Sequence, residues 1–148
     1  MRNGWFVILV LIIGITMLGT GCATVTNEPL EGTTWVLVSY GDPSGPQAAL
    51  EDVEVTAVFS RESDTGPGEL NGFAGCNTYF GSFETDGNKL TIGDMGSTMM
   101  ACEEAIMDQE AQYLSALAAA DSYSIQGNQL EISYDGGVQV LNFVAKSA

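Results

Sequence analysis

Hydrophobic and polar residues alternate along most of the chain after residue 30, which is the pattern of half-buried β-strands. Each alternating run is short and ends in glycine, proline, asparagine or aspartate, the residues that form turns. Asp-Gly pairs at residues 86–87 and 135–136 mark two hairpins, and residues 127–132 repeat the turn chemistry of residues 87–92. The predicted strands cover residues 34–40, 53–59, 69–72, 78–84, 89–92, 129–132 and 138–143.

One segment has a helical period instead. Residues 103–119 contain no glycine or proline, and Ile106, Tyr113, Leu114 and Leu117 fall on one side of the predicted helix. A series of hairpins with one helix indicates a mainly β fold of the α+β kind. We expect a small antiparallel β-barrel-like domain, or a strongly bent sheet, closed by this single α-helix.

The N-terminus has the features of an export signal. A basic tip at Arg2 precedes an apolar run and then small residues, so residues 1–21 are predicted to be a signal peptide. Cys22 resembles the lipid-bearing cysteine of bacterial-type lipoproteins, although Gly19 stands where leucine is usual. Residues 22–30 then form a lipidated tether, and residues 31–146 form the domain. Two alternatives remain open: residues 4–23 stay as an uncleaved anchor, or the chain is simply secreted.

The chain is strongly acidic, with a formal net charge of −15 at pH 7. The mature part keeps every Asp and Glu but only three basic residues, Arg61, Lys89 and Lys146. Such a domain repels phosphate, which excludes nucleic acid and anionic lipid headgroups as binding surfaces. Solubility is the favoured interpretation of the charge, and binding of a cation or a basic partner is the alternative.

Cys76 and Cys102 remain after Cys22 is assigned to lipid. In an oxidising compartment, an even pair of cysteines in a small domain predicts a disulfide. Two free buried thiols are the alternative.

The absence of histidine restricts the chemistry further. It removes Ser-His-Asp and Cys-His catalysis and histidine metal sites, and no phosphate-binding glycine motif occurs. We therefore predict no enzyme activity, no catalytic residue, no cofactor and no metal. Two weaker alternatives are a carboxylate-based hydrolase and a weak calcium site at Glu62, Asp64 and Glu69.

Four motifs together resemble the META domain, the family of HslJ-like lipoproteins. They are Gly-Thr-Thr-Trp at 32–35, Asn-Gly-Phe-Ala-Gly-Cys-Asn-Thr-Tyr-Phe-Gly at 71–81, Ser-Thr-Met-Met-Ala-Cys at 97–102 and Glu-Ala-Gln-Tyr-Leu-Ser-Ala-Leu at 110–117. The resemblance covers about residues 30–145. It implies a compact barrel-like domain with one helix, an envelope setting, often as a lipoprotein, and an association with stress. It implies no established reaction.

The residues of these motifs have mainly structural interpretations. Gly72 and Gly75 flank a turn that needs positive φ or a close backbone approach. Trp35 and Tyr79 are predicted to be core aromatics. Two predictions concern polar residues. The side-chain amide of Asn77 is expected to cap or cross-link the turn, and Thr98 is expected to be buried and hydrogen-bonded to backbone. A candidate binding cleft would be lined by Asn77, Thr98 and Glu110.

The expected function is that of a non-catalytic exported lipoprotein, a stress-related accessory or binding module of the cell envelope. The alternative is a purely structural stabiliser of the envelope. We expect a monomer on the outer side of its membrane, which is the outer membrane in a Gram-negative host and the cell surface otherwise. Expected partners are the membrane, through the lipid, and another envelope protein or a small ligand.

Overall fold

A computed structural model describes residues 26–63 and 66–147 of the chain. The predicted signal peptide, Cys22 and the alternative anchor over residues 4–23 lie outside these residues, as does Asp64. The strands are β1 (Thr34–Gly41), β2 (Gln47–Ala48), β3 (Thr56–Ser60), β4 (Gly68–Phe73), β5 (Thr78–Asp86), β6 (Lys89–Ile92), β7 (Gly96–Ser97), β8 (Ala120–Gln126), β9 (Gln129–Tyr134) and β10 (Gln139–Ala145).

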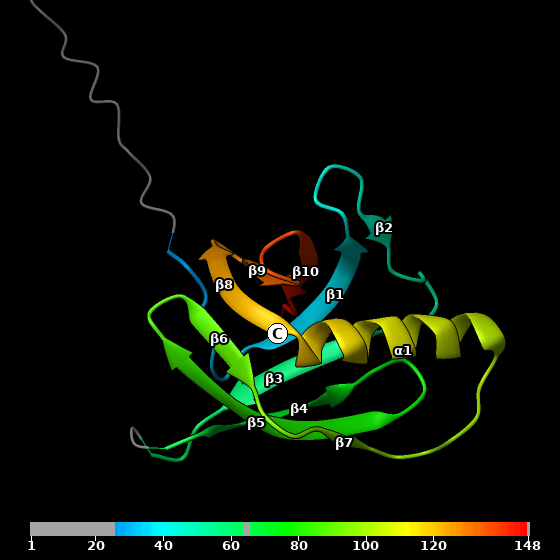
Figure 1. Ribbon diagram of the computed structural model, residues 1–148, viewed down its shortest axis with the longest axis horizontal. Helices are drawn as coiled ribbons and strands as arrows, with labels where there is room; N and C mark the ends of the chain where they lie inside the picture. Colours follow the sequence, from blue (N-terminus) through cyan, green and yellow to red (C-terminus); the bar gives the residue numbers. More distant parts are fainter. Residues whose placement is uncertain (1–25, 64–65, 148) are drawn as a thin grey trace, which may run out of the picture.

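The strands form a closed antiparallel barrel (Figure 1). Its order is β1–β3–β4–β5–β6–β8–β9–β10, and β10 pairs again with β1. This closing register runs from Trp35 opposite Ala145 to Gly41 opposite Val140. The short strands β2 and β7 pair with β1 and β5 outside the ring. The predicted mainly β fold with a barrel and one helix is therefore confirmed.

Alternation along the strands explains why the barrel has a single apolar interior. In β1, the side chains of Trp35 and Leu37 are buried, while Val38 is exposed. In β3, Ala57 and Phe59 are fully buried between less buried neighbours. Trp35 donates its indole N–H to the Leu30 carbonyl at 3.0 Å, so its one polar atom is satisfied inside the core. The prediction of Trp35 as a core aromatic is confirmed.

The helix α1 (Glu104–Ala118) lies across one end of the barrel, between β1 and β8–β10 on one side and β3–β7 on the other (Figure 1). Its own residues Tyr113 and Leu117 are completely buried on the side that faces the barrel. The Tyr113 ring meets Phe143 of β10 edge to face, with 6.2 Å between ring centroids. The predicted apolar side of the helix is thus the side that closes the barrel.

Antiparallel pairing divides the connections between the two ends of the barrel. The end closed by α1, here called the helix end, also holds the β1–β2, β4–β5 and β9–β10 connections. The opposite end, here called the N-terminal end, holds the β3–β4, β5–β6 and β8–β9 connections. Glu28 N–H donates to Gly127 O at 2.8 Å, and Gly127 N–H donates to Asn27 Oδ1 at 2.8 Å. Residues 27–30, which were predicted to be tether, are therefore attached to the N-terminal end.

The sequence pattern misses β2, β7 and β8. β8 follows the helix across three consecutive alanines without the glycine or proline that would mark a turn. It is also poor in apolar residues: Ala120, Tyr123 and Ile125 pack against the core, and all three are only partly buried. The predicted strand over residues 53–59 begins only at Thr56, although Val55 is buried.

Candidate functional site

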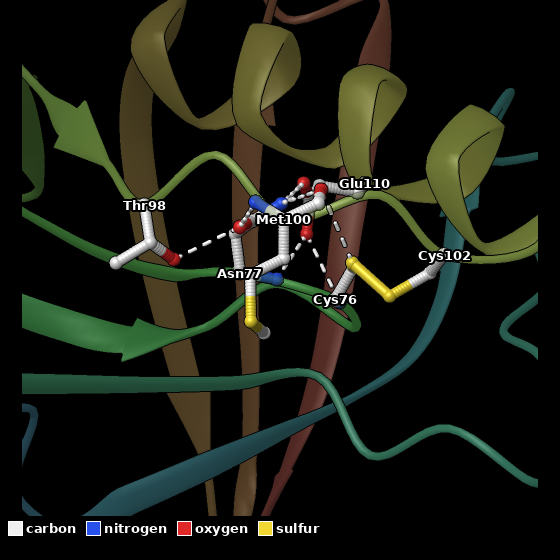
Figure 2. Close-up of a disulfide and its surroundings, with 6 residues drawn as sticks. All are labelled: Cys76, Asn77, Thr98, Met100, Cys102 and Glu110. Atoms are coloured by element: carbon white, nitrogen blue, oxygen red, sulfur yellow. Dashed lines mark hydrogen bonds between the residues drawn. A yellow bond between two sulfur atoms is a disulfide. The ribbon is translucent and has the colours of Figure 1, made fainter.

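The disulfide lies at the helix end (Figure 2). Cys76 and Cys102 are bonded, with their Cα atoms 6.0 Å apart. Cys76 stands in the connection between β4 and β5, and Cys102 stands two residues before α1. The bond thus ties the start of the helix to the barrel, and the predicted pairing is confirmed.

Glu110 brings a buried carboxylate from α1 to the same place. Its side chain is 5% exposed, and its Oε2 accepts the backbone N–H groups of Cys76 at 3.0 Å and Asn77 at 2.7 Å. Its Oε1 accepts the amide of Asn77 at 2.6 Å. A buried carboxylate is costly unless its oxygens are hydrogen-bonded, and these three donors meet that need.

Asn77 joins Glu110 to the segment before the helix. Its Oδ1 accepts the Thr98 hydroxyl at 2.9 Å and the Met100 N–H at 2.6 Å, and its Nδ2 also reaches Met100 O at 3.2 Å. Figure 2 shows Asn77 between these partners and Glu110. Because donors face Oδ1 and acceptors face Nδ2, the amide has one satisfactory orientation. We call Cys76, Asn77, Thr98, Met100 and Glu110 the Glu110 network.

A tyrosine pair lies deeper in the barrel. The Tyr79 hydroxyl donates to Thr56 O at 2.9 Å and lies 2.7 Å from the Tyr113 hydroxyl, which must then donate to it. Burial raises the pKa of Tyr79 and of Tyr113 well above the usual value for a phenol. Both phenols therefore stay neutral near pH 7.

A groove opens on the outside of the helix end. Its larger hollow, of about 630 Å³, lies between the β1–β2 connection, α1 and the β9–β10 turn. A smaller hollow of about 230 Å³ adjoins it and shares Tyr40, Gln47 and Gln112. We call the two together the helix-end groove. Its further polar lining residues are Asp42, Asp108, Gln109, Ser115, Tyr134, Asp135 and Gln139.

The groove carries negative charge and no basic lining residue. Hydrogen bonds from the Ser44 hydroxyl and N–H lower the pKa of Asp42, which keeps that exposed carboxylate ionised. Burial raises the pKa of Tyr40, and burial together with the neighbouring Asp135 raises that of Tyr134. The groove therefore presents neutral phenols beside carboxylates.

Gln109 is a buried side chain at the wall of the smaller hollow, 2% exposed. Its Oε1 accepts the Leu50 N–H at 2.8 Å, whereas its Nε2 has no hydrogen-bond partner. No other buried side-chain polar atom within residues 26–63 and 66–147 lacks a partner. An amide donor without an acceptor costs about 1–3 kcal/mol when buried, so this atom calls for an explanation.

Comparisons with known proteins establish the family. The model of the META domain matches residues 28–147, most of the chain. This chain belongs to the META domain family. No curated protein matches the sequence.

Solved structures share the META domain fold of this chain. An NMR structure of a protein from Burkholderia xenovorans is 31% identical, with a TM-score of 0.67 over 80% of this chain and 85% of that one. A second NMR structure is 18% identical, with a TM-score of 0.55 over 76% of this chain and 87% of that one. The crystal structure of a DUF4847 family protein from Bacteroides vulgatus is 14% identical, with a TM-score of 0.56 over 80% and 96% of the two chains. The last two likenesses show the fold alone.

The META motif residues have the structural roles predicted for the turn. Gly75 has a φ of +117°, which L side chains rarely adopt, and a Cβ on Gly72 would lie 2.0 Å from Thr56 O. Asn77 cross-links the turn and Tyr79 belongs to the core, as predicted. The prediction for Thr98 is wrong: its side chain is exposed and bonds to the Asn77 side chain, because Thr98 directly follows β7, which lies outside the ring.

The residues of the predicted cleft are brought together in the META domain. Asn77, Thr98 and Glu110 bond to one another in series, but Asn77 and Glu110 are almost completely buried. The helix-end groove is lined by other residues. A binding role for these three residues stays a prediction.

Sequence reasoning missed the groove itself. Tyr40 and Asp42 come from the first predicted strand and its break, Gln112 from the helix, and Tyr134 from the last hairpin. No spacing in the sequence links these positions, because only barrel closure brings them together. Among residues 26–63 and 66–147, no cluster of three or more metal-ligating side chains occurs, and no helix is long and apolar enough to cross a membrane.

Proposed function

We propose that this META domain is a non-catalytic binding module, exported and held on the outer side of a membrane through a lipid on Cys22. The observation that carries the proposal is the position of the helix-end groove. Residues 27–30 attach to the N-terminal end, and the groove lies at the opposite end. A lipid five residues before Asn27 would therefore place one end of the barrel at the membrane and direct the groove away from it.

The state of the reactive side chains supports a non-catalytic role. The buried carboxylate of Glu110 is engaged by three donors inside the protein, and the buried phenols bond to each other. Both cysteines of the domain are joined as a disulfide, and the chain contains no histidine. Catalysis near neutral pH needs a group with a suitable pKa that can reach the substrate. The exposed groove instead offers hydrogen-bonding amides, which suit recognition.

The family resemblance and the N-terminal sequence support the proposed setting. The module would act as a monomeric, stress-related accessory protein that binds another envelope protein or a small ligand. Its place would be the outer membrane in a Gram-negative host and the cell surface otherwise. Intact-mass analysis tests the anchor: the mature membrane form should begin at a lipid-modified Cys22, and Cys22→Ser should release the protein or leave it at precursor mass.

Photo-crosslinking in intact cells tests the binding role. A photoreactive residue at Gln112, which is exposed in the groove, should capture a specific partner or ligand. The same residue at Glu84, an exposed outward position of β5, is the matched control. Equal labelling at both positions would favour the purely structural stabiliser. Turnover of an ester, peptide or glycoside substrate that is lost on changing one Asp or Glu, with the fold intact, would overturn the non-catalytic role.

A further inference from the structure

Two features of the helix-end groove specify a ligand more closely than its shape does. One is an unsatisfied donor, Gln109 Nε2, at the wall of the smaller hollow. The other is the arrangement of charge, since Asp42 and Asp135 line the larger hollow and Asp108 lines the smaller one. The two observations are independent, because the first concerns a buried amide and the second concerns exposed carboxylates.

We propose that the groove binds a basic peptide segment, with a lysine or arginine side chain beside Asp42 and Asp135 and a main-chain carbonyl in the smaller hollow. This inference rests on the proposed binding function and names the chemistry of its ligand. An anionic ligand would meet carboxylates without a compensating cation. Gln109 Nε2 is buried in the ligand-free domain, so the Gln109 side chain would turn toward the hollow and donate to a main-chain carbonyl, the acceptor that it lacks.

The Asp42 carboxylate can accept a further hydrogen bond from a ligand. Both hydrogen bonds to Asp42, from the N–H and the hydroxyl of Ser44, end on Oδ1, which leaves Oδ2 open to a ligand. Tyr134, which is half-buried, lines the same hollow, and an ammonium or guanidinium group can be attracted to the face of such a ring. The site therefore combines charge, aromatic surface and amide groups within reach of one extended segment.

The positive charges of the domain lie elsewhere. Arg61 pairs with Glu31 at 3.1 Å and sits over the Phe83 ring, and Lys146 pairs with Glu54 at 2.7 Å. Lys89 follows the β5–β6 turn at the N-terminal end. The exported part carries 19 Asp and Glu against these three basic residues, so it would attract a basic peptide from a distance, and the groove would add short-range contacts.

The experiment is calorimetric titration of the full exported protein, purified from membranes in detergent. The probes are an acetylated and amidated Gly-Lys-Gly-Arg-Gly peptide, the same peptide with glutamate at both charged positions, and a neutral tetrasaccharide. The basic peptide should bind, more weakly at high salt, and the other two should not. Asp42→Asn combined with Asp135→Asn should weaken binding about tenfold, since each exposed pair contributes modestly.

The matched control removes the same charge elsewhere. Glu69→Gln combined with Glu84→Gln changes outward, exposed side chains of β4 and β5 and should alter the affinity by less than about twofold. A second measurement follows the Gln109 side-chain amide by NMR during titration, and its Nε2 protons should shift as the peptide binds. This signal comes from the unaltered protein, so it does not depend on any variant folding.

Several results would overturn the inference. They are no binding of the basic peptide, equal losses in the two charge variants, or binding of the tetrasaccharide alone. If the peptide fails while crosslinking at Gln112 still captures a ligand, the ligand class is wrong and the binding function stands. If both experiments fail, the binding function fails with it.

Discussion

The two ends of the barrel are closed in different ways. At the helix end, a disulfide, a buried carboxylate and a buried tyrosine pair connect α1 to β4 and β5. At the N-terminal end, Arg61 covers the Phe83 ring and pairs with Glu31, and residues 27–30 add a few hydrogen bonds. Buried polar contacts are costly to break, whereas a half-buried ion pair such as Arg61–Glu31 contributes less. Stability and precise geometry are therefore concentrated at the end that carries the groove. The end next to the proposed anchor should tolerate substitutions with smaller losses of stability.

The largest effect should come from breaking the Glu110 network. Glu110→Leu leaves the N–H groups of Cys76 and Asn77 unpaired inside the protein, and we expect a loss of roughly 4–6 kcal/mol in the free energy of unfolding. Urea denaturation measures it. Glu104→Leu on the exposed first turn of the same helix is the control and should change the free energy by about 0.5 kcal/mol or less. Equal losses in the two variants would contradict the network.

The second effect tests the covalent link at the helix end. Reduction of the disulfide, or Cys76→Ser with Cys102→Ser, opens a loop with a sequence separation of 26 residues. The chain-entropy model predicts a loss of about 3.5 kcal/mol in the free energy of unfolding. Denaturation with and without a phosphine reductant measures the loss, and the double serine variant should not respond to the reductant. An unchanged denaturation midpoint on reduction would show that the disulfide does not stabilise the helix end.

The third effect is alkaline loss of stability from the tyrosine pair. Because the pKa of Tyr79 and Tyr113 is raised on folding, their contribution is complete below pH 10 and is lost as the pH rises toward their folded values. Two such groups lower the free energy of unfolding by about 2–3 kcal/mol between pH 9 and pH 11. Denaturation midpoints across this range measure the fall. Tyr113→Phe should make the fall shallower, and an unchanged pH profile in that variant would argue against this assignment.

The smallest effect should come from the N-terminal end. Asn27→Ala removes the side-chain acceptor for Gly127 N–H at an exposed site, and we expect a loss of about 0.5–1 kcal/mol in the free energy of unfolding. Hydrogen exchange at Gly127 should also become faster. A loss as large as that of Glu110→Leu would show that contacts at the two ends contribute equally to the free energy of unfolding, against the difference described here.

The parts of the fold that were predictable are those with local signals. The alternating run at residues 34–40, the Asp-Gly hairpins and the apolar side of α1 all depend on neighbours in the sequence. The pairing of Cys76 with Cys102 followed from counting cysteines. The antiparallel closure by β1 and β10, in contrast, joins segments about 100 residues apart, and a hydrophobic pattern carries no information on partner choice.

The site was less predictable than the fold. Glu110 and Gln109 sit on the buried side of a helix, where the helical period alone would place apolar residues. Acidic residues in the early turns of a helix interact favourably with the helix dipole, whether they are exposed or buried. Only the surrounding N–H donors distinguish Glu110 from Glu104, and those donors come from a turn 33 residues earlier in the chain. Whether a polar side chain is buried depends on its hydrogen-bond partners in the folded protein. The residue type and its place in the sequence do not identify those partners.

The pairing of β1 with β10 also constrains how the protein is made. A chain that emerges N-terminus first delivers Trp35 long before Phe143, so the first strand must wait for the last before the ring can close. Until then, one edge of β1 offers unpaired backbone groups to any neighbouring strand. Assembly of this barrel is therefore a late, nearly all-or-none event, and a chain shortened by its final strand should remain open and prone to aggregate.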